Sequence, residues 1–485
     1  MKLRVLVTVL FSAWLFCACQ TPAEKTPPGT WLISNASIVD VETGEVSSPK
    51  TIAVHENRIW KIGEAADFSD ASQTTSIDLE GRFVIPGLWD AHVHLTFVPE
   101  LEQDMFRLFV ANGITSVRDT GGLLEKILPH RDKSRSGTET APRVFLAGPL
   151  VDGVPSVYDG SVPFRPEIAV GAPTPEAARA WVDSLTAVGA DLVKSYEMLT
   201  PEAFRALLER AREKQLKVTG HVPLHLDAKE ASNLGLSSME HLRNLEFSAS
   251  RDADSLLAAR KKMMQNEQNL SGGDLRSQIH RSQRTHAIAT QDADRRAELI
   301  STLKANDTWQ IPTMTIVTSR AFRLYDNPDW LNTFSALPQN VESQWREIVE
   351  RFSPTPPDES ALVFAEWALG MVNDLHQAEV NILAGTDTPI FPLTPGFSLH
   401  EELLLLEKSG LSPLAVLQTA TINPAKYFGL ENDLGTIAEG KLADLVILDE
   451  NPLENVANTK KVHAVVANGA LLQREDLDTM LYGER

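Results

Sequence analysis

The middle of the chain alternates short apolar runs with longer amphipathic stretches. Residues 191–196 (DLVKSY) form a strand-like run, residues 200–215 have the spacing of an amphipathic helix, and residues 217–221 form a second strand-like run. Thr200 followed by Pro201 favours a helix start, because a proline in the first turn lacks only an N–H that has no partner there. Repeated strand and helix units of this kind predict an α/β fold with a parallel sheet or barrel.

The two ends of the chain show a different pattern. Short β-like runs broken by Asn, Gly and Glu lie near the start and return near the end, for example at residues 51–54 and 443–448. We therefore predict a small β-sandwich domain built from both chain ends, residues 30–82 and 431–485. The barrel domain is predicted over residues 83–430, which exceeds the roughly 250 residues of a minimal (β/α)8 barrel.

The excess length predicts an insertion near residues 250–296. This stretch is rich in Arg, Gln, Asp and Lys and contains Gly272 and Gly273, a composition that suits neither a buried strand nor a buried helix. We interpret it as a helical excursion, and two roles fit it. It is a lid over the functional site, since long excursions in compact domains are often functional, or it is a solvated decoration of the surface.

The net charge of the chain narrows the class of molecule that the protein is expected to bind. The chain has 45 Lys and Arg against 65 Asp and Glu, a formal net charge of -20. A surface of this sign repels phosphate backbones and disfavours nonspecific binding to nucleic acid. A small-molecule substrate fits better, and the sequence is silent on whether the protein is a homo-oligomer.

The first 19 residues predict a secretory signal. Lys2 and Arg4 form a basic start, and the apolar run that follows is too short for a typical membrane-spanning helix. The run ends in Cys17-Ala18-Cys19, which resembles a bacterial lipobox with Cys19 as the lipidated residue and implies a periplasm-facing outer-membrane lipoprotein. Soluble periplasmic or secreted protein and an uncleaved anchor are the alternatives. Residues 20–29, rich in Pro and Thr, are predicted as a tether.

Both cysteines of the chain lie inside this segment. The mature body therefore has no disulfide, although the predicted compartment is oxidising. Any metal ion must then be bound by histidine, carboxylate or a modified lysine rather than by thiolate.

Residues 84–95 (VIPGLWDAHVHL) are the most informative stretch of the chain. On a strand, side chains two residues apart point to the same face, so His92 and His94 lie side by side. Two imidazoles on one face, shortly after a Pro-Gly turn and an Asp, can bind one divalent metal with little distortion of the backbone.

This stretch resembles the first barrel strand of the amidohydrolase superfamily, in its prolidase-like and imidazolonepropionase-like branch. The resemblance implies a TIM-type (β/α)8 barrel, and it implies further metal ligands at the ends of the fourth, fifth, sixth and eighth strands. Residues 434–446 (LGTIAEGKLADLV) also match the family, where the chain returns to the β-domain. The implied ligands match Lys194, His221, His241 and Asp387.

The resemblance also implies how these ligands are shared between two divalent ions, for which Zn suits the ligand types best. A desolvated lysine is a nucleophilic amine, and carbon dioxide converts Lys194 into a carbamate that bridges both ions. The first ion has His92, His94, Lys194 and Asp387 as ligands. The second ion has Lys194, His221 and His241.

The reaction implied by this site is hydrolysis of an amide-type C–N bond by a hydroxide shared between the two ions. The substrate is a dipeptide, an N-acyl amino acid or a cyclic amide, and Asp387 is the catalytic residue that moves the proton to the leaving amine. An ester, a lactone or a phosphotriester is the alternative substrate of the same site. A catalytically idle binding lipoprotein is the alternative from another class.

Two residues are predicted as substrate contacts. Tyr196 shares the strand face of Lys194, so its hydroxyl points toward the site, although a packed barrel tyrosine fits equally well. His400 follows the loop of Asp387 and is a candidate contact through the family resemblance, with an ordinary histidine at a helix start as the alternative. In some dipeptidase relatives an aromatic follows the fifth-strand histidine, whereas Val222 stands here, which argues against a carboxylate-specific dipeptidase.

Overall fold

The computed structural model describes residues 25–71, 74–137, 140–162 and 165–483. The predicted signal segment with Cys19, and the first half of the predicted tether, lie outside the described residues. Within the described part, no helix combines the length and apolar character needed to cross a bilayer.

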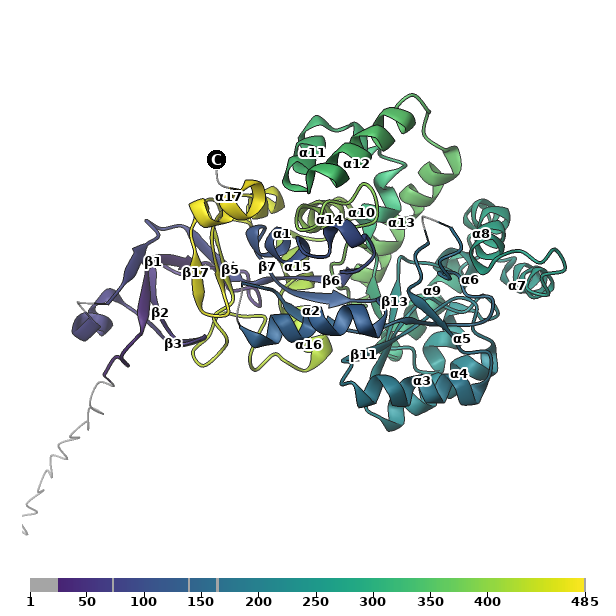
Figure 1. Cartoon of the computed structure of the whole chain (residues 1–485), viewed down its shortest axis with the longest axis horizontal. Helices are drawn as coiled ribbons and strands as arrows, with labels where there is room; N and C mark the ends of the chain where they lie inside the picture. Colours follow the sequence, from purple (N-terminus) through teal and green to yellow (C-terminus); the bar gives the residue numbers. More distant parts are fainter. Residues whose placement is uncertain (1–24, 72–73, 138–139, 163–164, 484–485) are drawn as a thin grey trace, which may run out of the picture.

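Both chain ends meet in one strongly bent, mostly antiparallel sheet, at one side of the molecule (Figure 1). Asn35 has a left-handed backbone, φ 53°, and here the first strand passes from one half of the sheet to the other. Side chains from both halves, Ile33 and Ile447 among them, form a separate apolar core. The strands are β1 (Trp31–Ile38), β2 (Lys50–His55), β3 (Arg58–Gly63), β4 (Ser76–Asp78), β5 (Phe83–Pro86), β15 (Leu445–Leu448), β16 (Val462–Ala467) and β17 (Ala470–Leu472).

The middle of the chain forms two parallel sheets. The first is β6-β7-β8, and the second is β10-β9-β11-β12-β13-β14. Their bounds are β6 (Leu88–Val93), β7 (Ile114–Asp119), β8 (Arg143–Leu146), β9 (Leu150–Asp152), β10 (Ala169–Gly171), β11 (Leu192–Ser195), β12 (Lys217–Gly220), β13 (Ser238–Glu240) and β14 (Trp309–Ile311).

Hydrogen bonds join these two sheets into a ring. On one side, the Asp191 N–H donates to the Leu146 carbonyl, which links β8 to the start of β11. On the other side, residues 381–388 lie between β14 and β6: the Leu383 N–H donates to Gln310, and the Ala91 N–H donates to Ala384. The strands β8 and β9 follow each other along the chain and together occupy one position of the ring. The ring therefore has the eight strand positions of a TIM-type barrel, which confirms the predicted fold class.

Helices cover the outside of the ring. The predicted helix at residues 200–215 is confirmed as α4, where the Thr200 side chain accepts from the Ala203 N–H and Pro201 occupies the first turn. The helices of the first half are α1 (Met105–Ala111), α2 (Leu124–Ser136), α3 (Pro175–Ala187), α4 (Pro201–Glu213), α5 (Ala228–Asn233) and α6 (Leu245–Ser248). Those of the second half are α9 (Ala293–Ala305), α10 (Met314–Ser319), α11 (Pro328–Asn332), α12 (Gln339–Phe352), α13 (Glu359–Gln377), α14 (Phe397–Lys408), α15 (Pro413–Thr419), α16 (Ile422–Phe428) and α17 (Arg474–Tyr482).

Two further helices occupy the stretch in which an insertion is predicted. These are α7 (Ala253–Met263) and α8 (Gly272–Ala289), and they lie at the end of the molecule away from the bent sheet (Figure 1). Arg260 of α7 donates to Gln283 of α8 at 2.6 Å and to Asn244 of the loop after β13 at 2.8 Å. The inserted pair is therefore tied to the barrel loop that follows the sixth strand position.

Candidate metal centre

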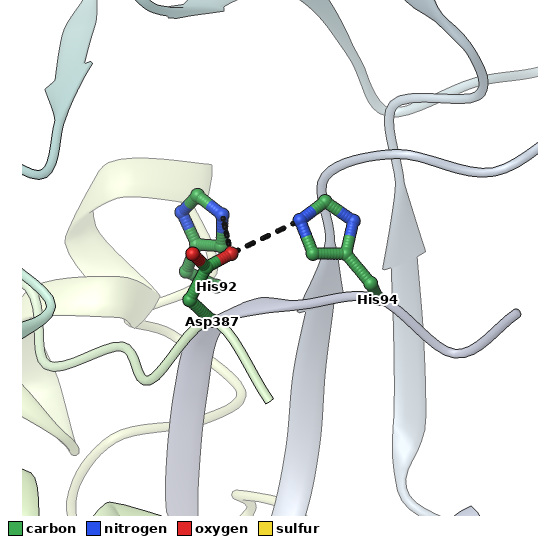
Figure 2. A group of neighbouring side chains, drawn as sticks. All are labelled: His92, His94 and Asp387. Carbon is green, nitrogen blue, oxygen red and sulfur yellow. Dashed lines mark hydrogen bonds and ion pairs between the residues drawn. The ribbon is translucent and has the colours of Figure 1, made fainter. Parts of the chain in front are cut away.

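Three of the predicted ligands meet where β6 and the segment 381–388 end. The Nε2 atoms of His92 and His94 each lie 3.1 Å from Asp387 Oδ1, and all three side chains are buried. Figure 2 shows both imidazole rings beside the carboxylate. This convergence of two imidazoles and one carboxylate suits a divalent metal ion.

Glycine permits the close approach of the two backbones. A Cβ atom on Gly385 would lie 2.8 Å from the Cβ of His92, so a larger residue would push the Asp387 segment away from β6. Asp90 then fixes the segment, because its carboxylate accepts from the Thr386 N–H at 3.1 Å and from the Thr386 hydroxyl at 2.7 Å. Asp387 itself has φ 71°, a strained conformation of the kind found at functional sites.

The other three predicted ligands line the same pocket. Lys194 lies on β11, His221 follows β12 and His241 follows β13. The ring centroid of His241 is 4.7 Å from that of His92 and 4.9 Å from that of His221. The fold thus brings together all six residues singled out in the sequence.

Each of the four histidines is held through its Nδ1 atom. A carbonyl or carboxylate acceptor at this position requires an N–H on Nδ1, and so does the Thr313 hydroxyl, because its own hydrogen is donated to the Pro312 carbonyl. This leaves Nε2 as the atom available to a metal. The Nδ1 partners are Glu240 Oε2 for His92 (2.6 Å), the Gly121 carbonyl for His94 (3.1 Å), Glu197 Oε1 for His221 (2.5 Å) and the Thr313 hydroxyl for His241 (2.6 Å).

Glu240 and Glu197 are site residues that sequence reasoning missed. Both are buried. Glu240 precedes His241, and besides His92 it accepts from Arg118 at 3.0 Å and lies 3.6 Å from Lys194 Nζ. For Glu240, the sequence did contain a signal, because this carboxylate stands directly beside a strand-end histidine. The residues that Glu240 contacts lie on other strands, however, and local sequence does not show them.

Replacing Glu240 by glutamine should weaken metal binding. The amide keeps the volume but loses the negative charge that orients His92, and loss of such a partner typically lowers metal affinity by about 10- to 100-fold. Titration of metal-free protein with Zn measures the change. Glu209→Gln, at an exposed ion pair with Arg179, is the control, and an unaltered affinity in Glu240→Gln would refute this positioning role.

The buried atoms of the site fit a metal ion. Among the described residues, neither His92 Nε2 nor Lys194 Nζ forms a hydrogen bond, although both are buried and each lies within ion-pair distance of a carboxylate. A buried polar group without a hydrogen bond is costly. Burial lowers the pKa of Lys194 to about 8, so part of this amine is neutral near neutral pH. The pKa of Asp387 is well below its ordinary value, because His241 and His92 outweigh the effect of burial.

Of the two predicted substrate contacts, the structure places Tyr196 in the pocket and His400 outside it. Tyr196 lines the pocket, with its ring centroid 4.3 Å from that of His221. His400 is buried in α14, where its ring nitrogens lie 3.1 Å from the Thr459 hydroxyl and 3.1 Å from the Asn112 carbonyl. The expectation for His400 is therefore corrected: its ring packs between a helix and the connection to the bent sheet, and both nitrogens are occupied there.

Comparison with known proteins agrees with this architecture. A model of the amidohydrolase family matches residues 369–472, which include Asp387. An adenine deaminase from Ruegeria sp. (strain TM1040) is 33% identical over 110 residues, 22% of this chain and 18% of the relative. An imidazolonepropionase from Vibrio vulnificus (strain CMCP6) is 33% identical over 133 residues, 26% of this chain and 32% of the relative. The chain thus matches less than a third of the length of these curated relatives.

Solved structures extend the likeness to nearly the whole fold. A Xaa-Pro dipeptidase with bound methionine superimposes with a TM-score of 0.65 at 21% identity, over 92% of this chain and 100% of that one. A bottromycin amidohydrolase gives a TM-score of 0.67 at 21% identity, over 94% and 89%. Residues 369–472 thus match the amidohydrolase family, and the barrel with its attached sheet has the fold of the superimposed dipeptidase and amidohydrolase structures.

Proposed function

We propose that this protein is a metal-dependent hydrolase that cleaves an amide-type C–N bond in a small molecule. One observation carries the proposal. Four histidines, each held through Nδ1, surround Asp387 and a buried Lys194, whose Nζ forms no hydrogen bond among the described residues, in one small pocket. The names of the relatives, a deaminase and a dipeptidase, are consistent with a reaction at a C–N bond.

Two divalent ions, Zn by ligand type, would be held by these residues. His92, His94 and Asp387 would bind the first ion, and His221 and His241 would bind the second. Lys194 would serve both as a carbamate. Three properties support this assignment: its Nζ is buried, it has no hydrogen-bond partner among the described residues, and burial lowers its pKa to about 8. A neutral amine is the form that adds carbon dioxide.

Metal ions in such a site make water nucleophilic near neutral pH and polarise the scissile carbonyl. The chain supplies the other functions. Asp387, ionised because its pKa is low, would accept the proton of the attacking water and pass it to the leaving amine. Tyr196, beside His221, would position the substrate through its hydroxyl. Glu240 and Glu197 would hold their histidines in place while the substrate reacts.

A matched substrate panel tests the reaction. Purified, Zn-loaded protein is offered dipeptides, N-acyl amino acids and cyclic amides, each beside the corresponding ester or lactone. We expect faster cleavage of the amide-type members in at least one series. Turnover confined to esters and lactones would replace the proposal with the alternative reaction of the same site, and an inactive protein with full metal content would refute both.

Metal content gives a second test. We expect two equivalents of metal per chain by elemental analysis, and loss of activity after prolonged chelation that Zn restores. Because the ions bind only the folded state, metal at 100 times its Kd should stabilise the protein by about 2.7 kcal/mol, read as a higher melting temperature. Less than one equivalent per chain in active protein would contradict the binuclear centre.

A further inference from the structure

The pocket has a second wall that contains none of the proposed metal ligands. Tyr158 and Tyr196 face it, together with two arginines. Arg243 comes from the loop directly after β13, and Arg276 comes from the inserted helix α8. The cavity between these side chains is small, about 30 Å³. Two guanidinium groups in so small a space concentrate positive charge beside the reacting centre.

Arg276 already has an anionic partner, but that partner is shared. Its Nε donates to Glu197 Oε1 at 2.9 Å. The same carboxylate lies 2.5 Å from His221 Nδ1 and 2.6 Å from His280 Nε2. Burial raises the pKa of Glu197, but Arg276 and then His280 outweigh it, so the pKa is well below its ordinary value. One negative charge thus serves three neighbours.

Arg243 has no ion-pair partner among the described residues, and its Nε is buried without a hydrogen bond. Arg243 is partly buried, and a cationic group whose N–H is removed from water without a partner is unfavourable; two neighbouring cations also repel each other. An anion bound between them would relieve both effects.

We infer that Arg243 and Arg276 bind a carboxylate of the substrate, so that the preferred substrates carry a carboxylate close to the scissile amide. This inference rests on the proposed C–N hydrolysis. A guanidinium group presents two parallel N–H donors that match the two oxygens of a carboxylate. The inserted helices contribute directly, because α8 supplies Arg276 and Arg260 of α7 holds Asn244, the neighbour of Arg243.

The experiment compares matched substrates. N-acetyl-L-amino acids and dipeptides are each paired with the carboxamide of the same compound, and cleavage of the internal amide is followed by mass spectrometry. Wild-type protein should have the higher kcat/KM for the carboxylate member. In Arg243→Gln this preference should fall by about 10- to 100-fold, the value of one hydrogen-bonded charge. Arg243→Lys keeps the charge and should retain part of the preference.

Arg281→Gln is the control, since Arg281 is an exposed arginine of the same helix α8 as Arg276 and should leave the preference unchanged. Arg276 is a poorer target because it also holds Glu197 beneath His221. Removal of a partly buried cation that has no ion-pair partner among the described residues should not lower the melting temperature of substrate-free Arg243→Gln, whereas loss of a structural arginine would.

Binding is measured independently of turnover. Calorimetric titration of Zn-loaded protein with the N-acetyl-L-amino acids should show weaker binding to Arg243→Gln than to wild type. If wild type cleaves carboxamides as well as carboxylates, or if Arg243→Gln keeps the full preference, the inference is wrong while the proposed hydrolysis stands. If neither member is cleaved but the carboxylates bind through Arg243, the proposed hydrolysis fails and the anion site stands.

Discussion

Asp387→Asn is expected to lower kcat/KM for an amide substrate by about 10²- to 10⁴-fold, the range typical of a lost general acid–base group. The amide oxygen can still contact a metal ion, but the side chain cannot accept a proton. The measurement is steady-state kinetics together with metal analysis of the same preparation. A variant that retains metal and loses turnover would separate the proton-transfer role from the ligand role.

The control for this substitution is Asp433→Asn. Asp433 forms a surface ion pair with Arg58 at 2.7 Å, and its side chain is 43% exposed, so its loss should leave kinetics and metal content unaltered. Asp387→Asn protein with wild-type kcat/KM would remove Asp387 from the proposed mechanism altogether.

Lys194→Ala is expected to remove one of the two proposed metal ions and to reduce turnover to near background. Alanine supplies no atom to bridge the two sites, and the void leaves Glu240, 3.6 Å from Nζ in the native protein, without that cation. Metal analysis and kinetics give the result. Lys194→Glu, which supplies a carboxylate on a shorter stem, should recover part of the metal content.

The carbamate can be observed directly. Native protein equilibrated with ¹³C-labelled bicarbonate should show a carbonyl resonance in its NMR spectrum that Lys194→Ala lacks. Lys217→Ala is a matched control: burial also lowers the pKa of Lys217, but this residue does not line the pocket. Full metal content and full activity in Lys194→Ala would refute the carbamate proposal.

The balance between cationic and anionic side chains explains why the pocket can contain two arginines and a buried lysine. Around the candidate site, Arg118 and Lys194 are buried and Arg243 is partly buried, against the buried carboxylates Glu197, Glu240 and Asp387. Burying such groups is unfavourable unless each finds a partner. Glu240 serves Arg118 and Lys194 together. Within the described part of the chain, the cationic group that most clearly lacks a partner is therefore Arg243, at the side of the pocket where we place the substrate.

Local sequence by itself determined much of the scaffold and of the site. Alternation with period two placed His92 and His94 on one strand face, and Thr200 with Pro201 marked the start of a helix. These features depend on neighbours within a few residues, so the sequence records them directly. The other four ligands needed the family resemblance, since nothing local distinguishes Lys194 from a core lysine.

Only the tertiary structure decided which charged residues work together. Glu240 holds His92 across 148 positions of the chain, and Arg276 reaches Glu197 across 79. The tertiary structure also decided that His400 lies outside the site. His400 follows the Asp387 loop closely in the sequence, but α14 turns the imidazole ring of His400 toward Asn112. Such pairings depend on how the barrel closes and where the inserted helices lie, and no local periodicity encodes either.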